Sequence, residues 1–155
     1  MSQEPSSTAI SAHPQAPPRV LLTGVSGQLG QALLASCPEG VNLIPLSRAQ
    51  LDLADARACH DLVSELRPDW VLNAGAYTAV DRAESEPDLA RAINAGAPEA
   101  FAQALAQGTG RLLQVSTDFV FDGSQGHPYR PDQALAPLGV YGATKAQGEQ
   151  AVLRI

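Results

Sequence analysis

The chain has 155 residues, of which 45% are hydrophobic and 17% are charged, and its formal net charge is −6. This length and composition suit one soluble globular domain with a core of its own. The acidic balance, without a basic cluster, argues against a nucleic-acid partner, and no apolar run is long enough to span a membrane. Cys37 and Cys59 lack C-x-x-C and metal-ligand spacing, so we expect reduced thiols, no metal site and a cytoplasmic protein.

The first part of the chain predicts a dinucleotide-binding turn. Residues 1–18 are rich in Ser, Pro, Gln and Ala, which predicts a disordered extension. From Arg19 onward, the apolar run 20–23 is typical of a parallel strand buried on both faces. It leads into Gly24-Val25-Ser26-Gly27-Gln28-Leu29-Gly30, and a helix is expected over 31–36. Glycines between a strand and a helix N-terminus let the backbone approach a pyrophosphate.

The residue after the second strand bears on the choice of cofactor. This strand is predicted at 41–46 and is followed by Ser47 and Arg48. An acid here would bond the ribose 2′-hydroxyl of NAD, whereas an arginine accommodates the 2′-phosphate of NADP. The sequence therefore favours NADP, and the alternative is that Arg48 is only a solvated loop cation. A helix is expected over 55–66, with Asp55 as its N-cap.

Small residues follow the third predicted strand, at 70–73. Residues 74–78 are Ala-Gly-Ala-Tyr-Thr, and small side chains at a strand's carboxyl end let a cofactor lie against the backbone. The acidic stretch 81–86 is interpreted as a solvated loop or short helix rather than a metal cluster. A long helix is predicted over 87–107, with Asn94 beside its apolar stripe. Asn94 is expected either to bond a neighbouring backbone group or to face water.

The last third of the chain carries the residues with acid–base chemistry. A fourth strand, 111–115, ends at Ser116 and Thr117, whose hydroxyls are expected to project into the crevice beside the glycine turn. An irregular loop over 122–137 precedes a helix from 141 to 155 that places Tyr141 and Lys145 one turn apart on one face. An ammonium about 4 Å from the phenol, at an effective dielectric near 20, favours the phenolate by about 4 kcal/mol. The pair could therefore transfer protons near neutral pH.

The alternation of strands and helices predicts an α/β fold, a Rossmann-type doubly wound parallel sheet, over residues 19–155. Right-handed crossovers would bring the carboxyl ends of the strands to one crevice. The glycine turn, Thr117, Tyr141 and Lys145 could then surround one ligand.

These motifs resemble the extended short-chain dehydrogenases/reductases and, more narrowly, the dTDP-4-dehydrorhamnose reductase family. The resemblance is carried by four stretches, residues 23–30, 67–87, 116–123 and 137–149. It implies reduction of dTDP-4-dehydro-L-rhamnose, a dTDP-4-keto-6-deoxy sugar, by NADPH or NADH. Because members of this family are much longer, we expect the sheet to be incomplete at its C-terminus and the substrate-binding half to be absent. The isolated chain is then expected to have little or no activity.

The resemblance also implies roles for individual residues. Tyr141 would donate the proton, Lys145 would be its electrostatic partner and contact the cofactor ribose, and Thr117 and Asp118 would lie beside the substrate. With the residues assigned from the motifs, the predicted cofactor contacts are Gly24, Gly27, Gln28, Leu29, Gly30, Arg48, Asp52, Leu53, Ala76, Tyr77, Thr78, Tyr141 and Lys145. The family allows a homodimer, and in some members a Mg²⁺ ion between subunits, for which this sequence offers no identifiable ligands.

Two other functions share these features. A nucleotide-sugar epimerase or dehydratase has the same fold and Tyr/Lys pair, but the block 116–123 disfavours it. A non-catalytic NADP-binding regulatory subunit, like that of methionine adenosyltransferase, is disfavoured by the intact Thr117, Tyr141 and Lys145.

Overall fold

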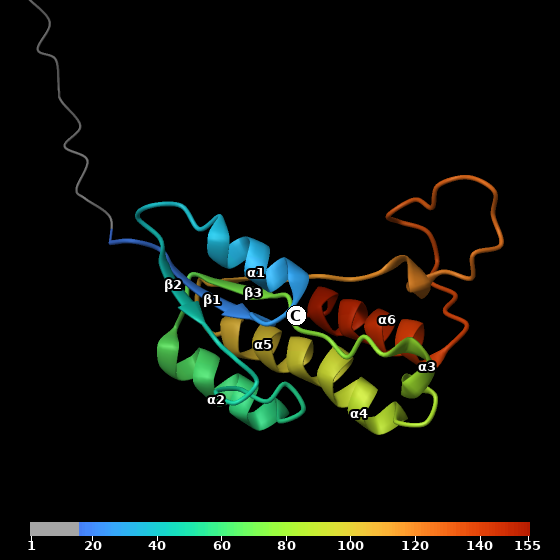
Figure 1. Ribbon diagram of the computed structural model, residues 1–155, viewed down its shortest axis with the longest axis horizontal. Helices are drawn as coiled ribbons and strands as arrows, with labels where there is room; N and C mark the ends of the chain where they lie inside the picture. Colours follow the sequence, from blue (N-terminus) through green and yellow to red (C-terminus); the bar gives the residue numbers. More distant parts are fainter. Residues whose placement is uncertain (1–15) are drawn as a thin grey trace, which may run out of the picture.

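The computed structural model describes residues 16–155, so most of the predicted disordered extension lies outside the described residues. Strands and helices alternate along the chain, which confirms the predicted α/β class (Figure 1). The elements are β1 (Arg19–Thr23), α1 (Gln28–Ala35), β2 (Asn42–Pro45), α2 (Ala56–Leu66), β3 (Trp70–Asn73), α3 (Val80–Ala83), α4 (Pro87–Arg91), the π-helix η1 (Ala92–Gly96), α5 (Ala97–Leu105), β4 (Arg111–Gln114), the 3₁₀-helix η2 (Asp118–Val120) and α6 (Val140–Leu153).

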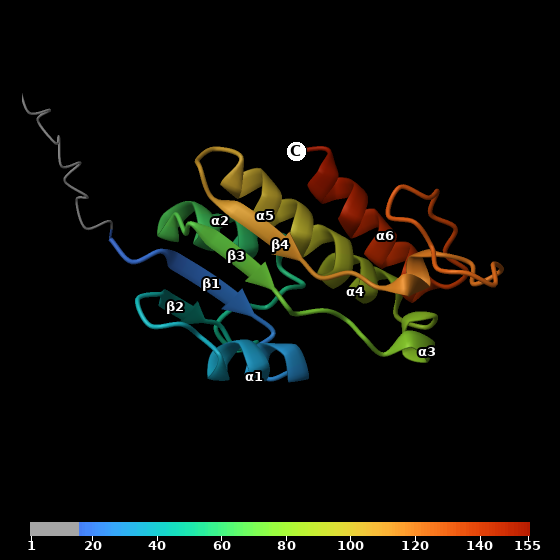
Figure 2. The ribbon, with the colours of Figure 1, turned by 90° about the horizontal axis from the view of Figure 1, so that it is seen from above.

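The strands form a parallel sheet in the order β2-β1-β3-β4. The chain moves from β1 to β2 on one side and returns to β3 on the other, so the direction of winding reverses between β1 and β3. In open α/β sheets ligands bind at the carboxyl ends of the strands beside such a reversal. Figure 2 shows the arrowheads of β1, β3 and β4 pointing to the same edge, with the start of α6 beyond β4.

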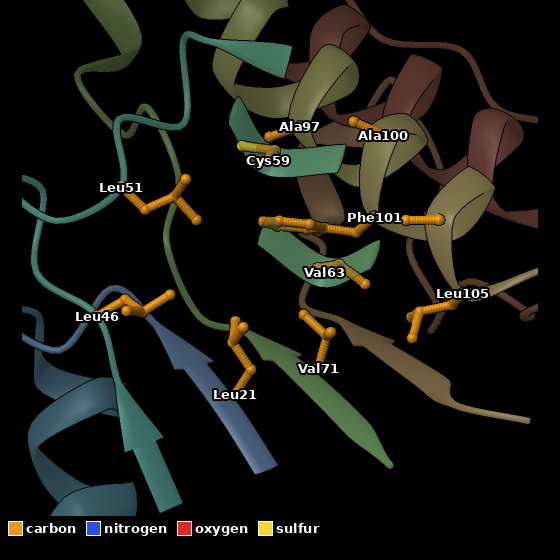
Figure 3. Packing of buried hydrophobic residues seen from close by; sticks show 11 residues of the cluster. Leu21, Leu46, Leu51, Cys59, Val63, Val71, Ala97, Ala100, Phe101 and Leu105 are labelled. Atoms are coloured by element: carbon orange, nitrogen blue, oxygen red, sulfur yellow. The ribbon is translucent and has the colours of Figure 1, made fainter. Parts of the chain in front are cut away.

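The hydrophobic core lies between the sheet and the helices α2 and α5. Helix α1 lies on the opposite face, and α6 packs beside α5 (Figures 1 and 2). Figure 3 shows Leu21 and Val71 of the sheet pointing toward Phe101 of α5 and Val63 of α2. Phe101 is fully buried, because its position in the predicted apolar stripe faces the sheet.

Strand β4 forms an edge of this sheet and is less covered than β1. Leu113 of β4 is 48% exposed, whereas Leu21 and Leu22 of β1 are fully buried. The predicted burial of the strand 20–23 on both faces is therefore confirmed for β1. Within residues 16–155, no helix combines the length and the apolar character that a bilayer span requires.

The predicted single helix over 87–107 is interrupted, and this prediction was wrong in detail. The π-helix η1 separates α4 from α5, and the Ala97 N–H donates to the carbonyl of Ala92, five residues earlier. Pro98 has no N–H to donate to the Asn94 carbonyl, so an uninterrupted ladder is impossible at this point. π-Bulges of this kind occur frequently at functional sites.

Other element boundaries differ by a few residues from those expected. Helix α1 begins at Gln28, three residues before the predicted start, because Gly27 has the extended backbone of an N-cap and Gly30 lies inside the helix. The N-cap of α2 is Asp55 as predicted, since its carboxylate accepts from the Ala58 N–H at 2.9 Å. The 122–137 stretch is irregular, and α6 starts at Val140.

Replacing Phe101 by Ala should lower the free energy of unfolding by about 3–5 kcal/mol, because it removes a fully buried ring from the core. Denaturant titration of the purified chain measures this loss. Leu153→Ala is the control, since Leu153 is 85% exposed and its truncation should change stability by less than about 0.5 kcal/mol. Equal losses in the two variants would contradict this assignment of the core.

Candidate cofactor and active site

Two glycines of the turn after β1, Gly24 and Gly30, have no room for a side chain. Gly24 has φ +69°, and a Cβ there would lie 2.5 Å from the backbone of Ala74 and Gly75. A Cβ on Gly30 would lie 2.1 Å from the Gly24 carbonyl oxygen. Gly27, the N-cap of α1, offers no side-chain oxygen to the first turn of the helix. The first N–H groups of α1 therefore have no side-chain cap, and the N-terminus of a helix in this state can bind an anion such as a pyrophosphate.

A pocket of about 150 Å³ adjoins this turn at the carboxyl ends of β1, β2 and β3. It brings together five predicted cofactor residues, Gly24, Arg48, Asp52, Leu53 and Ala76. The pocket is lined by Thr23, Gly24, Val25, Ser26, Leu46, Arg48, Leu51, Asp52, Leu53, Gly75, Ala76 and Ile93. A cavity of about 350 Å³ lies at the opposite ends of the strands, between the ends of α2 and α5, and none of the predicted site residues lines it.

The polar environment of the pocket supports a phosphate-bearing ligand at its outer end. The Arg48 side chain is exposed, and no ion pair involving it is present among the described residues. The Asp52 carboxylate accepts from the Ala54 N–H at 3.0 Å, so it stabilises its own loop. Leu53 packs against Gly75, where a Cβ would lie 2.5 Å from the leucine Cδ1. The absence of a side chain at Gly75 therefore lets Leu53 pack directly against the backbone there.

Hydrogen bonds join the ends of three strands beneath this pocket. The Thr23 hydroxyl donates to the Asn73 side-chain oxygen at 2.5 Å, and the Asn73 amide donates to Gln114 at 2.6 Å. The Gly75 N–H donates to the Thr23 hydroxyl at 3.3 Å. Sequence reasoning missed this network. Its signal was a polar residue at the last position of each of the apolar strands β1, β3 and β4.

Asn94 joins the segment after β3 to helix α6. It is 2% exposed, and its side-chain oxygen accepts from the Tyr77 N–H at 2.9 Å. Its amide group donates to the Tyr77 carbonyl and to the Thr144 hydroxyl, each at 3.1 Å. Thr144 in turn donates to the Tyr141 carbonyl at 2.9 Å. Of the two expectations for Asn94, a backbone partner was therefore correct.

The carbonyl of Asn94 also faces α6. A Cβ on Gly148 would lie 2.2 Å from the Asn94 carbonyl oxygen, so α6 can pack this closely only with glycine there. This is the carbonyl for which Pro98 provides no N–H. The π-helix thus places both the side chain and the backbone of Asn94 against the helix that carries Tyr141 and Lys145.

Lys145 is almost completely buried, with 4% exposed, and its Nζ donates to the Val115 carbonyl at 2.5 Å. Burial holds the pKa of the Lys145 ammonium below its ordinary value, and the Glu149 carboxylate opposes this shift. Tyr141, one turn earlier, is half-buried and contacts the Phe119 ring edge-to-face, with centroids 5.5 Å apart. The effect of Lys145 on the Tyr141 phenolate stays a prediction.

The turn after β4 packs against the start of α6. A Cβ on Gly142 would lie 2.1 Å from the Phe119 carbonyl oxygen, so the backbone of η2 can touch α6 there. Thr117 caps η2 by accepting from the Phe119 N–H at 3.3 Å, and its hydroxyl donates to Asp118 at 3.2 Å. Thr117, Asp118 and Tyr141 are thereby gathered at one end of α6.

The Ser116 hydroxyl was expected to project into the crevice, and this prediction was wrong. Ser116 donates to the Glu149 carboxylate on α6, so the hydroxyl is directed to the helix. The reason is that consecutive residues of an extended chain point to opposite sides. Thr117 and Ser116 therefore cannot face the same side.

The acidic stretch after α3 has intramolecular partners and is not only a solvated face. The Tyr77 hydroxyl donates to Glu86 at 2.7 Å, and Arg82 donates to the same carboxylate at 2.7 Å. These bonds hold the pKa of Glu86 below its ordinary value, and the hydrogen bond to Glu86 raises the pKa of Tyr77. Glu84 accepts from the Val140 N–H. Among residues 16–155, His, Cys, Asp and Glu form no group of three or more that could hold a metal ion.

The remaining predicted cofactor residues lie near the same edge. Gln28 and Leu29 are exposed at the start of α1, and Thr78 is exposed between β3 and α3. The structure thus forms two adjoining groups, one around the glycine turn and one around the start of α6. The network of Asn94 lies between them, because it contacts both Tyr77 and Thr144.

Asn94→Ala should lower the free energy of unfolding by about 1–3 kcal/mol, because it leaves the backbone groups of Tyr77 without partners in a partly buried place. Chemical denaturation measures the loss. The matched control is Asn42→Ala, whose side chain is exposed and whose truncation should cost less than about 0.5 kcal/mol. If the two variants had the same free energy of unfolding, the hydrogen bonds of Asn94 would not contribute to stability.

Comparison with known proteins identifies the family. Residues 18–155 match the RmlD substrate binding domain family. A dTDP-4-dehydrorhamnose reductase from Streptomyces griseus is 48% identical over 139 residues, which are 89% of this chain and 46% of that protein. A reductase of the same name from Clostridium acetobutylicum has a crystal structure that superposes with a TM-score of 0.84 at 36% identity, covering 88% of this chain and 49% of that one.

A second solved structure contains a cofactor. The dTDP-4-dehydrorhamnose reductase from Bacillus anthracis, in complex with NADP, superposes with a TM-score of 0.83 at 37% identity and covers 88% of this chain and 49% of that one. The chain spans about half the length of the curated relatives it matches. On the match of residues 18–155, the chain belongs to the RmlD substrate binding domain family.

Proposed function

We propose that residues 19–155 form the NAD(P)-binding and proton-donating half of a reductase that converts dTDP-4-dehydro-L-rhamnose to dTDP-L-rhamnose. One observation carries the proposal. A glycine turn with no room for a side chain at Gly24 and Gly30 and the helix bearing Tyr141 and Lys145 meet at one edge of one parallel sheet. The names of the relatives support the substrate, and the NADP complex of the Bacillus anthracis protein supports the cofactor.

The residues present fit a dinucleotide. Gly24, Gly27 and Gly30, with the exposed Gln28 and Leu29, would hold the pyrophosphate at the start of α1. Asp52 and Leu53 would line the adenine site, and Ala76, Tyr77 and Thr78 the inner side of the cofactor. Arg48, exposed at the edge of the pocket, would pair with the 2′-phosphate of NADPH. NADH would lack this ion pair, so we propose NADPH as the preferred cofactor.

The catalytic roles follow from the surroundings of α6. When bound, the nicotinamide would supply a hydride to the ketone carbon of the sugar. Tyr141 would donate its phenolic proton to the ketone oxygen, and the Thr117 hydroxyl would bond that oxygen with Asp118 beside the sugar. Lys145 is held by the Val115 carbonyl, so its ammonium is fixed one turn from Tyr141 and would stabilise the phenolate left behind.

This chain matches only about half of each relative, and this limits how much of the substrate site it can form. Because the matched part is about half of each relative, we propose that the rest of the nucleotide-sugar site belongs to sequence of the kind found in their other half. A homodimer would be formed by such a longer protein, and no residue described is proposed as a Mg²⁺ ligand. The 155-residue chain alone should bind NADPH and show little or no turnover.

Arg48→Asp should weaken NADPH binding relative to NADH binding by at least about tenfold, since it places a negative charge beside the 2′-phosphate. Titration of the 155-residue chain with each reduced cofactor, followed by nicotinamide fluorescence, measures the ratio. Arg57→Asp makes the same charge change on α2, where the side chain is 91% exposed and lines no part of this pocket. An unchanged ratio in Arg48→Asp would remove Arg48 from the cofactor site.

Tyr141→Phe should reduce turnover by about 10²-fold or more, because it deletes the proton donor and keeps the ring that packs against Phe119. The assay follows NADPH oxidation with dTDP-4-dehydrorhamnose by a chimera in which this chain is continued by the unmatched half of the Streptomyces griseus relative. The parent chimera provides the reference rate. Undiminished turnover in the variant would exclude Tyr141 as the acid.

A further inference from the structure

Helix α6 starts without a cap of its own. Its N-cap is Gly139, which has no side chain, and its first turn contains no acidic residue. The first N–H groups of a helix have no partner within the helix and need one from elsewhere. Glu84 supplies it from 56 positions earlier in the chain, since its Oε1 accepts from the Val140 N–H at 2.7 Å. A carboxylate at this end also interacts favourably with the helix dipole.

Gly139 and Glu84 are complementary to each other. A Cβ on Gly139 would lie 2.8 Å from the Glu84 Oε1, which is too close for an unshifted contact. The missing side chain therefore gives the carboxylate access to the helix start. A local N-cap such as Asp or Ser would accept instead from the N–H groups of Tyr141 or Gly142, the second and third residues of the helix. Its Cβ would crowd the Glu84 carboxylate.

Glu84 also lies at the end of the segment that we assign to the cofactor. This segment leaves β3, passes Ala76, Tyr77 and Thr78, forms α3 and ends with Glu84 as the C-cap of α3. It contacts α6 through two side chains. Asn94 links the Tyr77 backbone to Thr144, and Glu84 bonds Val140, so the two links lie on either side of Tyr141 in the sequence.

We propose that Glu84 is a positioning residue that fixes the start of the Tyr141 helix against the segment lining the cofactor. The helix is then held at both ends of the turn that carries the acid, by Asn94 beneath it and by Glu84 at its start. The consequence for catalysis rests on the proposed function, whereas the contact itself can be tested without it. A residue that served only as a helix cap could be replaced by a local cap without further effect.

The test uses the 155-residue chain and four variants: Glu84→Ala, Glu84→Gln, Asp81→Ala, and the double variant Glu84→Ala with Gly139→Asp. Asp81 is the matched control, because it is an exposed acid on α3 with no hydrogen bond to α6 in the structure described. Glu84→Gln keeps an acceptor oxygen without the charge. In the double variant, the carboxylate introduced by Gly139→Asp enters space that Glu84 no longer occupies, so it supplies a local cap to α6.

Three readouts separate capping from positioning. Hydrogen exchange at the Ala143 amide, which donates to the Gly139 carbonyl at 2.9 Å, reports fraying of the helix start and so the effect of either cap. The ring resonances of ¹³C-labelled tyrosine report the surroundings of Tyr141, and the chain has only three tyrosines, Tyr77, Tyr129 and Tyr141. Tyr129, stacked on Phe121 in the loop before α6, serves as the internal reference. NADPH affinity, measured on the same samples, reports whether the cofactor segment has moved.

In Glu84→Ala we expect Ala143 exchange to accelerate about fivefold, as for the loss of a helix cap, together with a shifted Tyr141 resonance and weaker NADPH binding. Glu84→Gln should recover part of each effect, and Asp81→Ala should resemble the parent chain. The double variant should recover slow Ala143 exchange, because a local cap also holds the first turn of α6, while the Tyr141 resonance and NADPH affinity stay as in Glu84→Ala.

Two results would overturn the proposal. One is a Tyr141 resonance that is unchanged in Glu84→Ala, and the other is recovery of all three readouts in the double variant, which would make Glu84 a cap alone. Failure of the proposed function looks different, because the parent chain would then not bind NADPH. The exchange and resonance measurements would still decide the role of Glu84, and Glu84→Gln serves if Glu84→Ala does not fold.

Discussion

The arrangement of the site depends on one buried amide. Asn94 bonds the Tyr77 backbone on one side and Thr144 on the other; the bond to Thr144 is buried and the bonds to Tyr77 are partly buried. A buried polar group without a partner costs about 1–3 kcal/mol. The fold therefore favours the placement of α6 in which the Asn94 side chain makes all three of its hydrogen bonds. That position places α6 beside the segment that follows β3. One side chain thus links the helix of Tyr141 and Lys145 to the segment proposed to line the cofactor.

Close backbone contacts complete this relation. Gly142 lets η2 touch α6, Gly148 lets α6 reach the Asn94 carbonyl, and Gly24 lets the turn after β1 lie on the end of β3. At each of these places a single methyl group would collide with backbone atoms at 2.1 to 2.5 Å. Glycine therefore sets the spacing between elements here, and hydrogen bonds then fix their orientation.

The sequence pointed to the residues proposed for the chemistry, but it missed most of the contacts that hold them in place. The strand, glycine turn and helix around Gly24 and Gly30 could be predicted from the sequence. The signals for them, an apolar run and the spacing of glycines, lie within a few neighbouring residues. The interruption by η1 was missed even though Gly96 and Pro98 were visible, since an apolar stripe repeats almost equally well through a π-bulge. Ser116 was assigned to the crevice, and the structure shows it bonded to Glu149.

By itself, the sequence determined the class of fold, the glycine turn, the Asp55 cap and the four-residue spacing of Tyr141 and Lys145. All of these depend on neighbours within one or two turns. Only the tertiary structure decided the partners of Asn94, Glu84, Ser116 and Lys145, which lie between 17 and 56 residues away along the chain. A polar side chain in a sequence shows what it can bond. Which of the distant groups it meets is fixed by the packing of helices on the sheet, and no local pattern carries that information.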